Sequence, residues 1–379
     1  MSDSLAVGSA IAPPRAAALD RLAPPDQRRK LQLALAALWL LDGVLQFQPF
    51  MFGRGFPQML AASAPGNPAL LASPISWSAA LITHHLVVLN AVFATVQVAL
   101  GLGIALRPTL KITLAASVAW SLSVWWLGEG FGGLLAGTAT PLTGAPGAVL
   151  LYALLAVLLW PADRPPAARA PADHAFADGA SAARPPAARA PADHASAVRP
   201  PTAPYVAARA VGPRIARASW LTIWAGLAAL AVLPASRTPA ATIAAMAPGQ
   251  PAWLAWIDAH AATVLLHHGP QAAIVLAAAF ALVALAPCLP ALAARPLIVL
   301  ALALSAVLWL AQGLGGILTG SATDPNTAPL LALLALAFWP APSVPQVAPF
   351  MITGSFGQIA SVSARDHETA AATSTPTGA

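Results

Sequence analysis

The segment GFGGLLAGTAT at residues 130–140 occurs a second time as GLGGILTGSAT at residues 313–323, with seven of eleven residues identical. Other stretches repeat at the same offset of 183 residues. APGNPALLA (64–72) matches APGQPAWLA (247–255), and the pair His84-His85 matches His267-His268. Trp126 likewise matches Trp309, and Glu129 corresponds to Gln312. Several similar stretches at one constant offset indicate a tandem duplication.

The composition of the chain predicts a membrane protein. Of its 379 residues 58% are hydrophobic and 8% are charged, and the mean hydropathy is +0.71. A soluble domain carries roughly 25% charged residues. Because so few charges cannot cover a surface that faces water, the chain belongs to the membrane class. Its one cysteine, Cys288, excludes an internal disulfide and a multi-thiolate metal site from this chain alone.

Eight apolar segments are candidate membrane helices, for which about 20 residues are needed. They cover residues 31–51, 81–106, 110–136, 146–160, 218–234, 261–287, 296–319 and 328–340. We therefore predict an all-α integral membrane protein with eight transmembrane helices, built as two four-helix repeats over residues 31–161 and 218–341. An even number of helices gives both copies the same orientation, so the repeats are parallel and related by an axis along the membrane normal.

The basic residues predict how the chain is oriented. With the N-terminus inside, 17 of the 19 basic residues fall on inner segments, and Arg54 and Arg237 fall outside. This imbalance predicts a bacterial plasma-membrane protein with both termini in the cytoplasm. Trp160 and Trp339 at inner helix ends fit an aromatic belt. The same charges account for the pI near 10.7 without a nucleic-acid partner.

The segments outside the helices are rich in Pro, Ala and Arg. We assign residues 1–30 to a basic cytoplasmic tail, 162–217 to a cytoplasmic linker and 342–379 to a second cytoplasmic tail. The linker contains RPPAARAPADHA twice, at 164–175 and at 184–195. Such composition without apolar periodicity predicts disorder for the linker and the C-terminal tail.

Polar residues within the predicted helices are the candidate binding residues, since ionisable groups are costly inside a membrane. Asp42 lies about 18 Å along the first helix, and Glu129 about 27 Å along the third. Asn90 and Gln97 are seven residues apart and share a helix face with Thr83. All of these fall in the outer half of the first repeat, so we expect any polar site to belong to that repeat.

The two histidine pairs, His84-His85 and His267-His268, allow two interpretations. Neighbouring residues on a helix point about 100° apart, so one histidine of each pair can face the bundle. One from each repeat could then hold b-type haem or a copper ion. In the favoured interpretation the histidines cap the outer ends of their helices, half in water.

The glycine-rich segments also have two aspects. Steps such as Gly128-xxx-Gly132 and Gly316-xxx-Gly320 predict close helix packing. The apolar segments that follow are short and are preceded by Gly and Pro. Short, interrupted segments at corresponding places in two repeats are typical of transporter binding sites. A tilted neighbouring helix or local thinning of the bilayer would explain the same pattern.

The stretch LALAALWLLDGVLQ (33–46), together with the tandem four-helix pattern, resembles the DoxX-like membrane proteins. In that family an apolar run, a small residue and a glycine precede a lysine; here Gly43 fits, and Gln46 stands where the lysine would be. The pattern GEGxGG…GAPG…LY is also similar to that of multi-pass proteins of high-GC bacteria. The DoxX-like resemblance covers each four-helix half and implies association with quinone and thiol redox systems as a partner subunit.

Three functions remain open at this point. The leading one is a redox-associated accessory subunit without chemistry of its own, in contact with the lipid bilayer and a membrane redox partner. The second is a small-solute or metal permease that uses Asp42, Glu129 and the outer histidines. The third is a haem- or copper-binding membrane protein. The sequence has no Ser/His/Asp, paired-carboxylate or HExxH arrangement, so we do not expect an enzyme.

Overall fold

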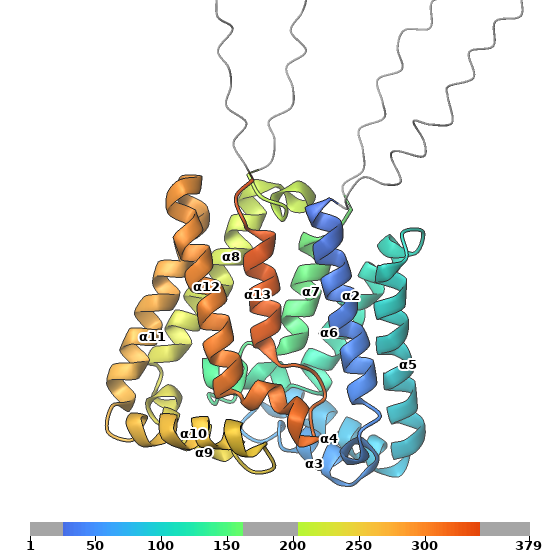
Figure 1. Cartoon of the computed structure of the whole chain (residues 1–379). Coiled ribbons are helices and arrows are strands. Elements are labelled where there is room, and N and C mark those ends of the chain that lie inside the picture. The colour runs from blue at the N-terminus through green and yellow to red at the C-terminus, as the bar shows by residue number, and fades with distance from the viewer. Residues whose placement is uncertain (1–25, 162–203, 342–379) are drawn as a thin grey trace, which may run out of the picture. The chain divides into compact units, whose positions relative to one another are not determined.

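The structure, a computed structural model, describes residues 26–161 and 204–341 (Figure 1). Residues 1–25, 162–203 and 342–379, which include most of the predicted tails and linker, lie outside the described residues. All the regular elements of the described part are helices, as predicted for an all-α protein.

Eight of these helices run lengthwise, and they follow the order of the eight predicted segments (Figure 1). The first set is α2 (Gln27–Leu45), α5 (Leu86–Ala105), α6 (Leu110–Leu127) and α7 (Ala148–Leu158). The second set is α8 (Ala208–Val232), α11 (Gly269–Ala284), α12 (Ala291–Ala311) and α13 (Thr327–Ala337). In the described part, five of the eight, namely α5, α6, α8, α11 with its extension to Cys288, and α12, are long and apolar enough to cross a membrane. This is consistent with a multi-pass membrane protein.

The other three lengthwise helices differ from the predicted spans. Helix α2 has 19 residues, but it opens with three basic residues and contains Asp42. Helices α7 and α13 have 11 residues each. At 1.5 Å per residue each is about 17 Å long, roughly half of the apolar thickness of a bilayer. The described residues therefore contain five helices of membrane-spanning length where the sequence predicted eight.

The two short helices form the centre of the core. They pack against each other, and the longer helices surround them (Figure 1). Leu151 and Leu155 of α7 and Leu330 and Leu334 of α13 are fully buried. The core cluster that contains them takes residues from both sets of helices. The two predicted repeats therefore share one hydrophobic core.

Four shorter helices lie across one end of the lengthwise helices (Figure 1). They are α3 (Gly55–Ala61), α4 (Ala69–His84), α9 (Pro239–Met246) and α10 (Ala252–Leu265). The chain bends at His85 (φ −127°, ψ 35°) and at His268 (φ −122°, ψ 18°), with nearly the same dihedrals. The predicted helices 81–106 and 261–287 thus begin too early, because a crosswise helix ends inside each. The bend also separates Thr83 from the face that carries Asn90 and Gln97.

The glycine-rich segments form left-handed turns. Helix α6 ends at Leu127 and α12 at Ala311, short of the predicted ends at 136 and 319. Four consecutive residues then have positive φ, in 130–133 (53°, 59°, 63°, 72°) and again in 313–316 (61°, 54°, 67°, 73°). An L-residue pays about 1–2 kcal/mol in this region, whereas glycine does not. The prediction of glycine steps between packed helices is wrong here, because the segments are not α-helical.

Both left-handed turns are held by the same contacts. Trp125 Nε1 donates to the Pro146 carbonyl at 2.7 Å, and Trp309 Nε1 donates to the Pro325 carbonyl at 3.0 Å. Gly132 lies directly against Pro146, as Gly315 lies against Pro325. In this geometry Trp309 corresponds to Trp125 and not to Trp126, as the constant offset had suggested.

The end of the predicted linker belongs to the folded part. Helix α8 begins at Ala208, ten residues before the predicted start at 218. Tyr205 is buried, and its ring stacks on Phe338 with centroids 4.7 Å apart. The Ala207 amide donates to the Ala337 carbonyl at 3.0 Å. These contacts fix the start of the second set against the end of α13.

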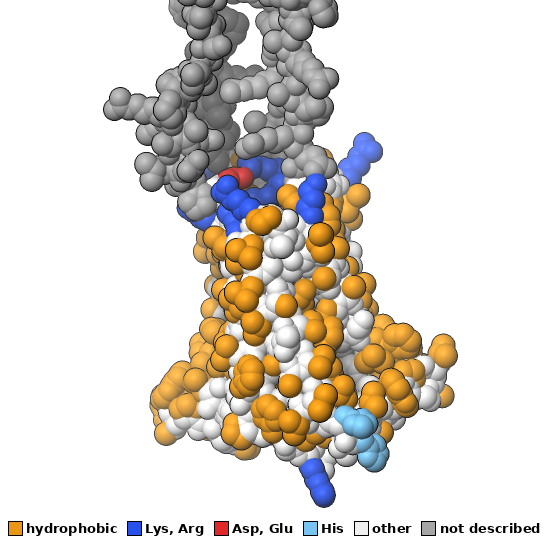
Figure 2. Space-filling model, turned by 90° about the vertical axis from the view of Figure 1, so that its right-hand side faces the viewer, with side chains coloured by type: hydrophobic (Ala, Val, Ile, Leu, Met, Phe, Trp, Pro, Cys, Tyr) orange, Lys and Arg blue, Asp and Glu red, His pale blue; other side chains and the backbone are white. Residues whose placement is uncertain are grey.

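Basic residues gather at one end of the molecule. Figure 2 shows Lys and Arg side chains at the end away from the crosswise helices and apolar side chains over the flank. At that end, α2, α6, α8 and α12 begin and α5 ends (Figure 1). The basic residues there are Arg28, Arg29, Lys30, Arg107, Lys111, Arg209, Arg214, Arg217 and Arg295, whereas Arg54 and Arg237 lie near the crosswise helices.

Gly132→Ala and Gly137→Ala separate backbone strain from close packing. Both glycines have positive φ, 63° and 71°, but a Cβ at Gly137 meets nothing within 4 Å. We expect Gly137→Ala to lower stability by about 1–2 kcal/mol through strain alone. Gly132→Ala should lower it further, because its Cβ would collide with the Pro146 carbonyl oxygen. Thermal unfolding of the purified protein in detergent measures both, and equal shifts would contradict the packing role.

Candidate functional site

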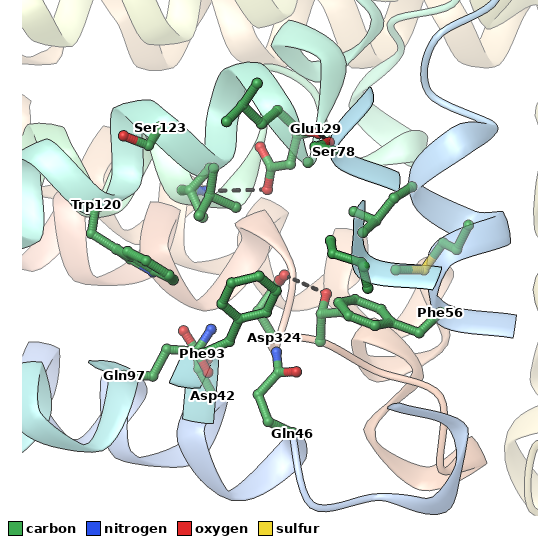
Figure 3. A pocket seen from close by; sticks show the side chains of 18 of the residues that line it. Asp42, Gln46, Phe56, Ser78, Phe93, Gln97, Trp120, Ser123, Glu129 and Asp324 are labelled. Atoms are coloured by element: carbon green, nitrogen blue, oxygen red, sulfur yellow. Dashed lines mark hydrogen bonds between the residues drawn. The ribbon is translucent and has the colours of Figure 1, made fainter. Parts of the chain in front are cut away.

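A cavity of about 240 Å³ lies between the first set of helices and the crosswise helices α3 and α4 (Figure 3). Three of the four predicted polar residues line it: Asp42, Gln97 and Glu129. Gln46 lines it as well. Asn90 does not; it is fully buried, and its Nδ2 donates to the Gln46 carbonyl at 2.8 Å. We call this space the Asp42 cavity.

Asp324 also lines the Asp42 cavity, although it belongs to the second set of helices (Figure 3). It lies on the connection between the 3₁₀ segment η6 (Gly313–Thr319) and α13. Its Oδ1 accepts from the Asn326 amide at 2.7 Å, and its Oδ2 accepts from the Thr323 hydroxyl at 2.9 Å. These two bonds hold the carboxylate in one orientation.

Sequence reasoning missed Asp324 because the residue 183 positions earlier is Pro141, which has no carboxyl group. A comparison of the copies by similarity passes over such a position. The available signal was different in kind: Asp324 and Asp258 are the only acidic residues in 218–341.

The connections of the two sets cross each other. Gln312, at the end of α12, is buried and donates through Nε2 to the Pro141 carbonyl at 3.0 Å. Pro141 begins the 3₁₀ segment η3 (Pro141–Thr143) of the first set. Where the connections meet, Gly144 lies directly against the Asn326 side chain. Each set therefore places part of its connecting segment in the other.

Asp42 lies inside the bundle with 1% of its surface exposed, and its Oδ1 has no hydrogen-bond partner. The ring of Trp39, one turn earlier in α2, packs on Tyr152 with centroids 4.2 Å apart. Tyr152 is close enough to interact with Asp42, and its own hydroxyl has no bond of good geometry. The charged groups that act on Asp42 are Asp324 and Glu129, both of its own sign.

Glu129 follows the end of α6 and reaches the start of α7. Its Oε1 accepts from the Val149 amide at 3.3 Å, which satisfies one free amide in the first turn of α7. Its Oε2 lies against Gly147 and has no partner. One carboxylate oxygen thus has a structural role, and the other remains available for a ligand.

Unpartnered polar atoms concentrate at the Asp42 cavity. Among the residues that line it, the buried atoms without a partner are Asp42 Oδ1, Gln46 Oε1, Gln97 Oε1, Trp120 Nε1 and Glu129 Oε2. Native proteins pair roughly 90% or more of such groups with protein or ordered water. A cavity with this many free polar atoms is therefore suited to water or a polar ligand.

A second space of about 620 Å³ adjoins the cavity, and we call it the vestibule. Met59, Gly128, Glu129, Thr323 and Asp324 line both spaces, so the two carboxylates stand at their common boundary. The rest of the vestibule is formed by the connection between α3 and α4 and by the glycine-rich connections of both sets. It therefore lies toward the end of the molecule that carries the crosswise helices (Figure 1).

The second set of helices has a corresponding cavity of different character. This cavity, about 340 Å³, is lined by apolar residues of α8, α9, α10, α11 and α12, by Pro141 and Leu142, and by one polar residue, Ser236. The buried positions Leu35, Trp39 and Asp42 of α2 match Trp220, Trp224 and Leu227 of α8. Gln312 likewise replaces Glu129. The polar candidates are thus gathered in the first set, although Asp324 completes their site.

The structure does not bring the histidine pairs together. His84, His85, His267 and His268 are all exposed. The α4–α5 corner and the α10–α11 corner lie at opposite edges of the molecule (Figure 1). Within residues 26–161 and 204–341 no group of three or more His, Cys, Asp or Glu residues is arranged to hold a metal ion. A haem or copper site shared between the pairs is therefore not formed in this arrangement.

No family model, curated protein or solved structure matches this chain. The DoxX-like resemblance stays a prediction, and function has to be inferred from the site.

Asp42→Leu should make the protein more stable, because it copies Leu227, the matching residue of α8. A buried polar atom without a partner costs about 1–3 kcal/mol. We expect its removal to raise the unfolding temperature by on the order of 2–4 °C. The reciprocal Leu227→Asp should lower the unfolding temperature, since it buries a carboxyl group among apolar residues. If Asp42→Leu is destabilising, Asp42 has a structural partner that this interpretation lacks.

Proposed function

We propose that this chain is a multi-pass membrane protein that binds a small solute in the Asp42 cavity, as the binding step of a permease. One observation carries this proposal: three carboxyl groups, Asp42, Glu129 and Asp324, face one cavity that adjoins a larger vestibule. Buried polar groups without partners are expensive, and proteins retain them where they serve a ligand.

The distribution of charge supports entry from the outer side of the membrane. The helix ends rich in Lys and Arg lie away from the vestibule (Figure 2). By the positive-inside rule those ends face the cytoplasm, which places the vestibule outside. This is the orientation that the sequence predicted, with both termini cytoplasmic in a bacterial plasma membrane.

The interrupted helices support the transport step. Helices α7 and α13 begin inside the molecule, after glycine-rich connections that line the vestibule. Transporters commonly bind their substrates at such broken helices, at matching places in two repeats. The shared left-handed turns and tryptophan bonds fit the proposed pair of parallel four-helix repeats.

Two other proposals rest on the sequence. A DoxX-like accessory subunit would copurify with a membrane redox partner that holds the cofactor. A haem protein would show a Soret band that disappears in a His85→Ala/His268→Ala double variant. The unpartnered carboxyl groups of the Asp42 cavity favour solute binding over both.

Cysteine labelling in intact cells tests whether the cavity opens to the outside. The native Cys288 is exposed near the basic end, so it is first replaced by Ser and serves as the inner reference. We expect Thr323→Cys, at the boundary between the two spaces, and Ser78→Cys, within the cavity, to react with a membrane-impermeant thiol reagent added outside.

Ser117→Cys is the matched control, because Ser117 is fully buried and does not line the cavity. It should not react from either side. Reaction of Thr323→Cys only from the side on which Cys288 reacts would reverse the orientation. No reaction at Thr323→Cys from either side would show a closed vestibule and remove the proposed binding step.

A further inference from the structure

The charge of the two spaces decides which solute they can hold. Neither the Asp42 cavity nor the vestibule is lined by a Lys, Arg or His residue. Carboxylates of one sign in a medium of low dielectric repel each other and need a compensating cation or proton. Among the described residues that line these spaces, Asp42, Glu129 and Asp324 have no basic neighbour to supply that charge.

The walls of the Asp42 cavity determine the size and nature of that cation. Four aromatic residues line it, namely Trp39, Phe56, Phe93 and Trp120 (Figure 3 labels the last three). Aromatic faces attract organic cations, most strongly where water is excluded. The volume of about 240 Å³ exceeds the roughly 150 Å³ that suffices for benzene. It is below the roughly 300 Å³ at which sites for drug-sized ligands begin.

The unpartnered atoms favour a donor over an acceptor. Asp42 Oδ1, Gln46 Oε1, Gln97 Oε1 and Glu129 Oε2 are acceptors, and each is buried without a bond. The side chains of Asp42, Gln46 and Gln97 are 1%, 3% and 9% exposed, so bulk water does not satisfy them. An ammonium group presents three N–H donors and no acceptor, which complements this set.

A bare metal ion fits the cavity less well than an organic cation. A divalent ion needs several oxygen ligands close to one point, and Mg²⁺ keeps much of its water shell. No group of three acidic, histidine or cysteine residues in the described ranges converges in this way. The apolar and aromatic walls cannot replace lost water ligands, whereas they match the body of an organic ligand.

From these contacts we infer that the ligand is a small organic ammonium ion, a primary amine carried on an aromatic or similarly apolar body. The amine lies among Asp42, Glu129 and Asp324, and the body packs on the aromatic wall. This inference rests on the proposed function, since it names the class of solute for that same cavity. Asp324 makes the site a joint product of both sets of helices.

Three probes with one ring and different charges test the inference on the purified full chain. Benzylamine is the cation, benzyl alcohol the neutral analogue and benzoate the anion. Binding is followed by tryptophan fluorescence and by the shift in unfolding temperature. We expect benzylamine to bind at least about tenfold more tightly than benzyl alcohol, the size expected for one paired buried charge. Benzoate should not bind.

Charge-removing variants assign the contribution of each carboxyl group. Asp42→Asn and Asp324→Asn should each weaken benzylamine binding at least about tenfold and leave benzyl alcohol unchanged. Glu129→Gln should do the same, and it should fold because Gln312 occupies the matching place in the second set. Asp258→Asn is the control: Asp258 is 1% exposed in α10, but it lines neither space.

The outcomes separate this inference from the proposed function. Equal binding of benzylamine and benzyl alcohol would overturn the cation and leave a solute-binding cavity. Binding of benzylamine that Asp258→Asn weakens as much as Asp42→Asn would overturn the location. No binding of any probe, with Thr323→Cys and Ser78→Cys still labelled from outside, would overturn the ligand class alone. No binding together with no labelling would overturn both proposals.

Discussion

The architecture depends on one constraint: a helix of 11 residues cannot cross the apolar layer of a membrane by itself. Helices α7 and α13 nevertheless form the centre of the core, and their missing length is made up by irregular backbone. Irregular backbone at such a depth must be covered by protein or line a space, because lipid cannot satisfy its polar groups. The crosswise helices, the left-handed turns and the vestibule are all consequences of this requirement.

The two sets of helices solve this problem with the same backbone and different side chains. In both, a tryptophan near the end of a long helix holds the connection that leads to the short helix. The second set then fills its interior with apolar groups, whereas the first keeps carboxyl and amide groups at the corresponding depth. Since the backbones agree, fold stability alone does not require the polar groups of the first set.

The sequence was a good guide to the order of the lengthwise helices and to three residues of the Asp42 cavity. Hydrophobic runs show where helices can form, but they do not show bends such as those at His85 and His268. Glycine spacing suggested helix packing because a left-handed turn has no hydrophobic period of its own. Asp324 was missed for another reason: the crossing of the connections is a tertiary feature, and no local pattern encodes it. Tyr205 looked like linker because one aromatic residue hardly changes a Pro- and Ala-rich composition.

The crossing of the connections also has a consequence for the order in which the protein becomes competent during synthesis. Asp42 and Asp324 are 282 residues apart in the chain (324 minus 42). The ribosome makes the first set of helices well before Asp324 exists, and domains generally fold in the order of synthesis. Until the last connection arrives, the cavity lacks one wall and one carboxyl group. A chain cut short after the first set would therefore carry most of the binding residues without a finished site.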